Sequence, residues 1–345
     1  MSADFNSHAQ LYALLARLFL EELDRPLALY LRGLPGLAEH IPPDPAVDDW
    51  LGDLRAEHQW LFGLNVYPYE AIFRDRDLML NTASTSRVVA LYQACGFAPA
   101  ARLRAGAPDH LGVELALMAE LVSRLPHDPP ARPRIAELLH QHLAAWLPPC
   151  SEALARVARA PLYRALAEIA TELVLADLER FPAPETAEIG RATRHKTGQN
   201  AQISEVWRTE AYAPALTPGG EGLEDERGLR PIVRRLLTPD DLGVFISRAD
   251  IAAVGHALAL PAPIAEREQM LVALFGAAGQ FELVPALLAA LGGLLRGADG
   301  AYARLAADHP AWVAQGRVWR GRVAAGLALL DELAREHHDS LNDET

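Results

Sequence analysis

The stretch APDHLGVELALM (residues 107–118) sets a polar Asp-His pair at the mouth of a strongly apolar helix. Pro108 stops a helix that arrives from upstream, and the Asp109 side chain can cap the unpaired amides of a new one. After this start, apolar residues recur at helical spacing at Leu111, Leu115, Met118, Val122 and Leu125. We therefore predict a helix over residues 108–125, with Asp109 and His110 on an exposed rim at its start.

The same apolar spacing recurs on both sides of this helix, and the alternation typical of strands is nearly absent. Further helices are predicted around 11–19, from Asp44-Pro45 onward, over 84–95 with Gly96 as the end, over 130–147 and over 161–180. The first half of the sequence therefore predicts an all-α bundle.

Residues 184–228 interrupt the helical pattern with prolines, glycines and polar residues, which is the composition of a linker. Helical periodicity returns near Leu229, and residues 247–250 form a capping box ahead of a further helix. Amphipathic helices then follow over 264–278, 281–296 and 310–336. We predict a helical bundle over 1–183, a linker over 184–228 and a second, smaller all-α domain over 229–345.

The composition restricts the possible partners and the compartment. The formal net charge is −13, and residues 1–80 hold 13 acidic and 6 basic side chains. Sequence-independent nucleic-acid binding needs a basic surface, so we exclude it, and a basic peptide is a more natural partner. The N-terminus has no cationic leader, no apolar run approaches the roughly 18 residues of a membrane helix, and two cysteines suit a reducing compartment. We expect a cytoplasmic protein that does not span a membrane.

A second unusual string, YPYEAIF (residues 67–73), is rich in aromatic residues, and Pro68 keeps it from being a helix interior. Other notable strings are VVALY at 88–92, Gly96-Phe97, the Asp109-His110 helix start, WLP at 146–148 and PLY at 161–163. In this order they resemble the TorD/DmsD family of molybdoenzyme maturation chaperones. The segment 237–248 resembles the C-terminal extension of longer members, so the chain looks like a long form.

This resemblance implies an all-helical chaperone with no cofactor of its own. Such a chaperone binds, in the cytoplasm, the signal peptide and the apo form of a molybdopterin oxidoreductase, and assists cofactor insertion before export. The implied peptide-binding residues are Tyr67, Pro68, Tyr69, Glu70, Phe73, Asp109, His110 and Glu114. Aromatic rings on a rim would accept the apolar part of the peptide while Glu70 meets its arginines. A homodimer is possible.

Each of these residues also has a purely structural interpretation. Asp109 is a good helix cap, Glu114 can accept a hydrogen bond from His110 one turn earlier, and the aromatics of 67–73 could belong to a core. The chain could instead be an all-α adaptor or regulatory scaffold that does not recognise signal peptides. It could also be an enzyme whose site the sequence does not reveal.

No catalytic residue and no metal site is predicted. His140 and His142 are two residues apart on a helix, so they cannot face one ion together. The string GRATRHKT (190–197) resembles a phosphate-binding loop, but His195 replaces a glycine that such a loop needs. We therefore expect a binding protein and no enzyme.

Overall fold

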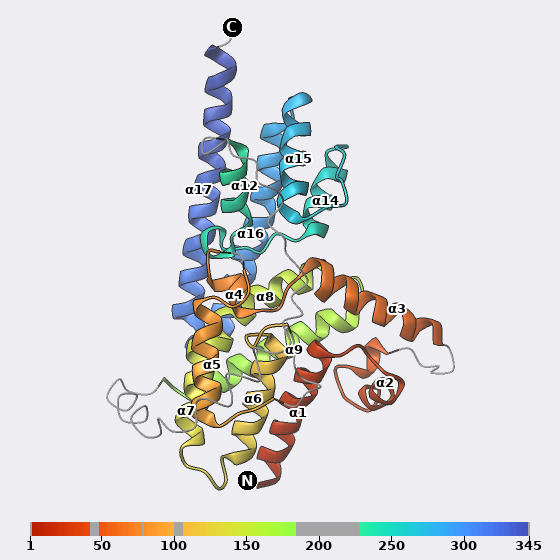
Figure 1. The fold of residues 1–345 in the computed structure, drawn as a ribbon, viewed down its shortest axis with the longest axis vertical. Coiled ribbons are helices and arrows are strands. Elements are labelled where there is room, and N and C mark those ends of the chain that lie inside the picture. Colours follow the sequence, from red (N-terminus) through yellow and green to blue (C-terminus); the bar gives the residue numbers. More distant parts are fainter. Residues whose placement is uncertain (1, 42–47, 78, 100–105, 184–227, 344–345) are drawn as a thin grey trace. The chain divides into compact units, whose positions relative to one another are not determined.

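The computed structural model describes residues 2–41, 48–77, 79–99, 106–183 and 228–343 (Figure 1). Every regular element in these residues is a helix, and their one β-type pairing is an isolated bridge between Tyr69 and His110. The prediction of an all-α fold is confirmed. Nowhere in these ranges does a helix combine the length and the apolarity that a membrane crossing requires. The helix start predicted at 44–45, the linker up to residue 227 and the string 190–197 lie outside the described residues.

The chain forms two compact units, and each draws on several segments. Unit 1 takes residues 1–56, 68–147 and 168–221, and unit 2 takes 57–67, 148–167 and 222–345. Unit 2 thus combines two segments of the predicted N-terminal domain with the predicted C-terminal one.

The helices of the first half include nearly all those that the periodicity predicts. They are α1 (Ser2–Leu20), α2 (Arg25–Leu31), α3 (Asp48–His58), α4 (Glu70–Arg74), α5 (Ala83–Cys95), α6 (Leu111–Arg124), α7 (Ala131–Leu138), α8 (Ala144–Val157) and α9 (Pro161–Arg180). In the described part of this half, three short turns accompany them: the 3-10 turn η1 (Ala38–His40) and the π-helical turns η2 (Gln59–Asn65) and η4 (Leu139–Leu143). As predicted, α5 ends at Gly96, which adopts the left-handed conformation with φ 61°.

Helix α6 forms the core of unit 1, because every residue from Leu111 to Met118 is buried. A helix that is apolar on all sides is expected in an interior. Helix α1 lies alongside α6 (Figure 1), and the two approach most closely at Gly112. A Cβ atom at Gly112 would lie 2.4 Å from Leu20 Cγ and 2.7 Å from the Ala16 carbonyl oxygen. Only glycine permits this approach, which fixes the start of α6 against α1.

Helix α8 corrects the prediction that a helix ends at residue 147. It runs to Val157 through Pro148 and Pro149, although each proline removes an amide donor from the helix. The residues that follow supply apolar packing, since Cys150 and Leu154 are fully buried. We attribute the continuation of the helix to this burial, which sequence spacing alone does not reveal.

The C-terminal part of unit 2 contains six helices in the described residues. They are α12 (Leu229–Leu237), α13 (Pro239–Leu242), α14 (Arg248–Ala257), α15 (Arg267–Gln280), α16 (Val284–Asp308) and α17 (Val313–Asp343), with the 3-10 turn η5 (Pro310–Trp312) before α17. The two longest, α16 and α17, run side by side (Figure 1) over a core that buries Tyr302, Trp312 and Trp319. The predicted capping box is present at the start of α14, where Ser247 and Asp250 bond each other's backbone amides.

The segment from residue 245 into the first turn of α14 explains why unit 2 includes parts of the first half of the chain. Arg156 of α8 donates to the Phe245 carbonyl oxygen at 2.6 Å and to Asp250 Oδ1 at 2.9 Å. The Ala249 amide donates to Asn65 Oδ1 at 2.9 Å. These polar bonds join residues 57–67 and 148–167 to the C-terminal helices.

Candidate functional site

The structure pairs the two strings that the sequence singled out. The Glu70 amide donates to the Asp109 carbonyl oxygen at 2.9 Å, and the Leu111 amide donates to the Pro68 carbonyl oxygen at 2.8 Å. These two bonds flank the isolated bridge between Tyr69 and His110. Pro68 stands just before the bridge on one side, and Pro108 lies in the turn that leads to the bridge on the other. The start of α4 and the start of α6 are therefore fastened to each other.

Asp109 caps a helix, but a different one from the helix predicted. Its Oδ2 accepts from the Ala71 amide of α4 at 2.8 Å, so the side chain satisfies an amide 38 residues earlier in the chain. Burial raises the pKa of Asp109 to about 6, and the charge of Glu70 adds to the rise against the hydrogen bond from Ala71. The cap of α6 is His110, whose Nδ1 accepts from the Gly112 amide at 3.1 Å. That bond requires a lone pair on Nδ1, so its proton lies on Nε2.

Tyr69 is the half-buried aromatic residue of this site. Its ring meets the His110 ring edge to face, with the centroids 4.9 Å apart. Burial raises the pKa of Tyr69 to about 12, and the charge of Asp109 contributes to the shift. The phenol is therefore neutral over the whole physiological pH range and offers an apolar face with a polar end.

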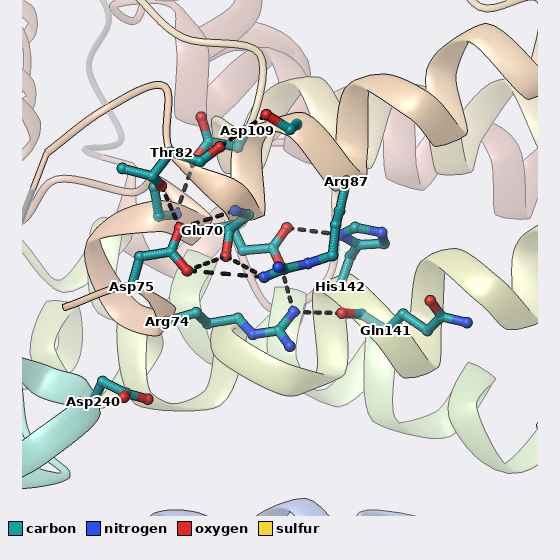
Figure 2. Close-up of polar contacts among 12 residues, drawn as sticks. Glu70, Arg74, Asp75, Thr82, Arg87, Asp109, Gln141, His142 and Asp240 are labelled. Carbon is teal, nitrogen blue, oxygen red and sulfur yellow. Dashed lines mark hydrogen bonds and ion pairs between the residues drawn. The ribbon is translucent and has the colours of Figure 1, made fainter. Parts of the chain in front are cut away.

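Glu70 lies at the centre of a buried polar cluster in unit 1 (Figure 2). Its Oε2 accepts from His142 Nδ1 at 2.7 Å, and its Oε1 is paired with the Arg74 guanidinium. Arg74 also donates to the Gln141 carbonyl oxygen. The Glu70 side chain is fully buried, so both of its oxygens are engaged inside the protein.

Glu114 is the third buried carboxyl of the cluster. Its Oε2 accepts from Trp146 Nε1 at 3.3 Å, while its Oε1 has no hydrogen-bond partner among the described residues. Burial raises the pKa of Glu114 well above its ordinary value, and the charges of Glu70 and Asp109 add to the rise. Phe73 packs beside the same indole, with ring centroids 5.7 Å apart.

Tyr67 belongs to unit 2, unlike the other seven predicted residues. Its hydroxyl donates to the Leu64 carbonyl oxygen at 3.3 Å. Its ring lies edge to face with Phe245 at 6.3 Å between centroids, and the Arg267 guanidinium lies 6.0 Å from its centroid. The structure thus gives Tyr67 a packing role within unit 2.

The expectation that Asp109 and His110 lie on an exposed rim is wrong. Glu70, Asp109 and Glu114 have no exposed surface, and His110 is 6% exposed. The physical reason is that two loops lead into helices side by side here. Water does not reach their amides or the Trp146 indole, so these donors need acceptors inside the protein. Pro68 and Phe73 are buried with them. A proline and a capping residue predict a helix start, but they do not predict whether that start faces solvent.

Sequence reasoning missed the residues that pair with Glu70 in this cluster. The pairing of Arg74 with Glu70 could have been predicted, because an acid and a base four residues apart on a helix can pair. That of His142 could not, since this residue reaches Glu70 across 72 residues through a π-helical turn. Sequence reasoning also missed Asp75, whose side chain accepts from the Ser84 amide at 2.9 Å and so caps the start of α5 (Figure 2).

Unit 1 also has a groove of about 480 Å³ along α1 and α6. Small side chains form its walls, namely Ala9, Ala13 and Ala16 of α1 and Ala116 and Ala119 of α6, with Phe97 at one side. Gln10, Arg17, Glu120 and Ser123 supply polar edges. The groove can therefore accept an apolar chain with polar groups at its margins.

The histidines and cysteines of the described residues do not gather into a metal-binding cluster. No group of histidine, cysteine and acidic residues among them has the arrangement to hold a metal ion. His140 Nε2 bonds the Phe181 carbonyl oxygen at 2.9 Å, whereas His142 turns to Glu70. Burial raises the pKa of the Cys95 thiol to about 11, which keeps it a weak nucleophile.

Comparison with known proteins relates part of the chain to a family. Residues 14–152 match the family described as nitrate reductase delta subunit, and both paired strings lie inside the match. None of the curated proteins matches the chain. The proteins of this family are chaperones that act with the catalytic subunits of molybdoenzymes. Residues 14–152 therefore belong to the nitrate reductase delta subunit family of molybdoenzyme maturation chaperones, and the resemblance to TorD/DmsD is confirmed.

Proposed function

We propose that this chain is a cytoplasmic, system-specific chaperone for a molybdopterin oxidoreductase. It binds the signal peptide and the apo form of that enzyme and holds the enzyme until the cofactor is inserted, before export. The observation that carries the proposal is the family match over residues 14–152, which includes the fastened starts of α4 and α6.

The chemistry of the site favours an apolar partner over a cationic one. All three carboxyls near Tyr69 are buried, and Glu70 is already paired with Arg74 and His142. Exposing any of them to an arginine of the peptide would break bonds inside the protein. We therefore assign peptide contact to the half-buried ring of Tyr69, with His110 beside it and the carboxyls in support.

The groove along α1 and α6 is the best place in unit 1 for the apolar segment of the signal peptide. Alanine walls let a helical or extended chain approach closely, and the polar margins at Gln10 and Glu120 suit the ends of an apolar run. Binding driven by apolar contact depends little on ionic strength. The affinity should change by less than about threefold between roughly 0.05 M and 0.5 M salt.

The proposal is tested by titrating the full chain with a fluorescent twin-arginine signal peptide and reading its anisotropy. Ala13→Trp fills the groove and should weaken binding of the peptide at least about tenfold. Tyr69→Ala removes the assigned contact ring and should weaken binding by a similar factor. Ala90→Trp places the same bulk at an exposed position of α5 and serves as the matched control.

Two outcomes would count against the proposal. Equal affinity for a scrambled peptide of the same composition would favour an adaptor without signal-peptide recognition. Binding that the twin arginines dominate, and that salt abolishes, would contradict the apolar site while leaving the chaperone function in place.

A further inference from the structure

The π-helical turn η4 reaches α4 through two consecutive residues. A π turn carries one residue more than an α turn, which redirects the side chains and frees carbonyl groups from the regular ladder. In η4 the Gln141 carbonyl oxygen accepts from Arg74, and His142 Nδ1 meets Glu70 Oε2 at 2.7 Å (Figure 2). His140, two residues before His142, bonds instead to the Phe181 carbonyl oxygen.

Glu70 is therefore held at both its backbone and its side chain. Its amide is bonded to the Asp109 carbonyl oxygen, and its two carboxylate oxygens are bonded to His142 and to Arg74. Tyr69 is the residue just before it and the N-cap of α4. Because one peptide unit joins them, the place and direction of the Tyr69 ring depend on how firmly Glu70 is held.

We infer that His142, presented by the π turn η4, is a positioning residue that fixes Tyr69 for peptide contact by acting through Glu70. This inference rests on the proposed function. The His142 side chain is only 3% exposed, so it acts without touching the partner. The carboxylate of Glu70 transmits its effect to the half-buried ring of Tyr69.

Variants of His142 in the full chain separate this role from simple packing. His142→Asn keeps an amide N–H near the position of Nδ1, so it should stay within about threefold of the parent affinity for the signal peptide. His142→Leu leaves a Glu70 oxygen unpaired and should weaken binding about tenfold. In a Tyr69→Ala background the same change should have almost no further effect, because the ring that it positions is gone. His140→Leu, from the same turn, is the matched control and should leave the affinity unchanged.

Hydrogen exchange of the backbone amides supplies a measurement that needs no partner. His142→Leu should speed exchange at the Glu70 and Leu111 amides about tenfold, while His142→Asn and His140→Leu should not. If Leu at 142 prevents folding, Arg74→Met removes the other bond to Glu70 and should give the same pattern. Unchanged exchange, or an affinity loss that persists fully without Tyr69, would overturn the inference. Normal exchange effects in a chain that binds no signal peptide would instead reject the proposed function alone.

Discussion

Replacing Asp109 with asparagine isolates the cost of burying its charge. The carboxyl is fully buried, and its Oδ2 accepts from the Ala71 amide at 2.8 Å. Burial raises its pKa from 3.8 to about 6, with the charge of Glu70 as a further cause. Asparagine cannot ionise, yet its side-chain oxygen can accept the same bond from Ala71. The variant therefore removes the charge and keeps the helix cap.

The sign of the effect follows from the direction of the shift. Because the pKa of Asp109 is higher in the folded chain than in the unfolded one, the folded chain binds the proton more tightly. The stability that this proton contributes is fully present below about pH 4 and is lost as the pH rises through about 6. A shift of about 2 units corresponds to about 3 kcal/mol in the free energy of unfolding. Relative to the parent, Asp109→Asn should therefore gain about 3 kcal/mol between about pH 4 and pH 7.

The assay is urea unfolding followed by circular dichroism across this pH range, with Asp109→Ala as the contrast. Alanine also removes the charge, but it leaves the buried Ala71 amide without an acceptor, which costs about 1–3 kcal/mol at every pH. The asparagine variant should thus be more stable than the alanine variant throughout. A parent-to-asparagine difference that does not change with pH would refute the assigned burial of an ionised carboxylate.

Three other substitutions test separate parts of the structure. Gly112→Ala forces a Cβ atom to within 2.4 Å of Leu20 Cγ, so urea unfolding should show a loss of about 1–3 kcal/mol, and a neutral result would mean that α1 and α6 are not so close. Glu114→Gln should gain thermal stability relative to the parent as the pH rises above the ordinary carboxyl pKa of about 4.5, because the buried carboxyl resists ionisation in the folded chain while the unfolded chain ionises freely; a difference in thermal midpoint that does not change with pH would contradict the raised pKa. Arg156→Met leaves the largely buried carboxylates of Glu152 and Asp250 in unit 2 without their counter-charge, and the free energy of unfolding should fall by about 3 kcal/mol. The loss should appear as faster hydrogen exchange in α14, and unchanged exchange there would show that the ion pairs contribute little.

The sequence predicts local features of this fold well, because those features depend on neighbouring residues. Gly96 ends α5 since only a left-handed residue closes a helix in that way, and the capping box at residues 247–250 needs four consecutive residues. The apolar repeat of α6 indicated its extent to within three residues at the start. Such signals are contained within one or two helical turns.

The sequence singled out the two strings that the structure pairs, but it did not predict that they are buried. The pairing of residues 68–70 with 109–111 is a bond between loops, so no periodicity reports it. Glu70 is paired inside the protein with His142, which lies 72 residues away in the π turn η4. Polar residues are usually exposed. This expectation fails where helix starts meet and use the carboxylates as hydrogen-bond acceptors.

The discontinuous build of unit 2 has a consequence during synthesis on the ribosome. Asn65 and its partner Ala249 are 184 residues apart, so translation at about 5–20 residues per second leaves the earlier segment waiting roughly 10–40 s. Throughout that interval the nascent chain lacks the C-terminal helices that complete unit 2. A premature stop codon ahead of residue 229 would make this waiting permanent, so such fragments should aggregate or be degraded instead of accumulating as a shorter working protein.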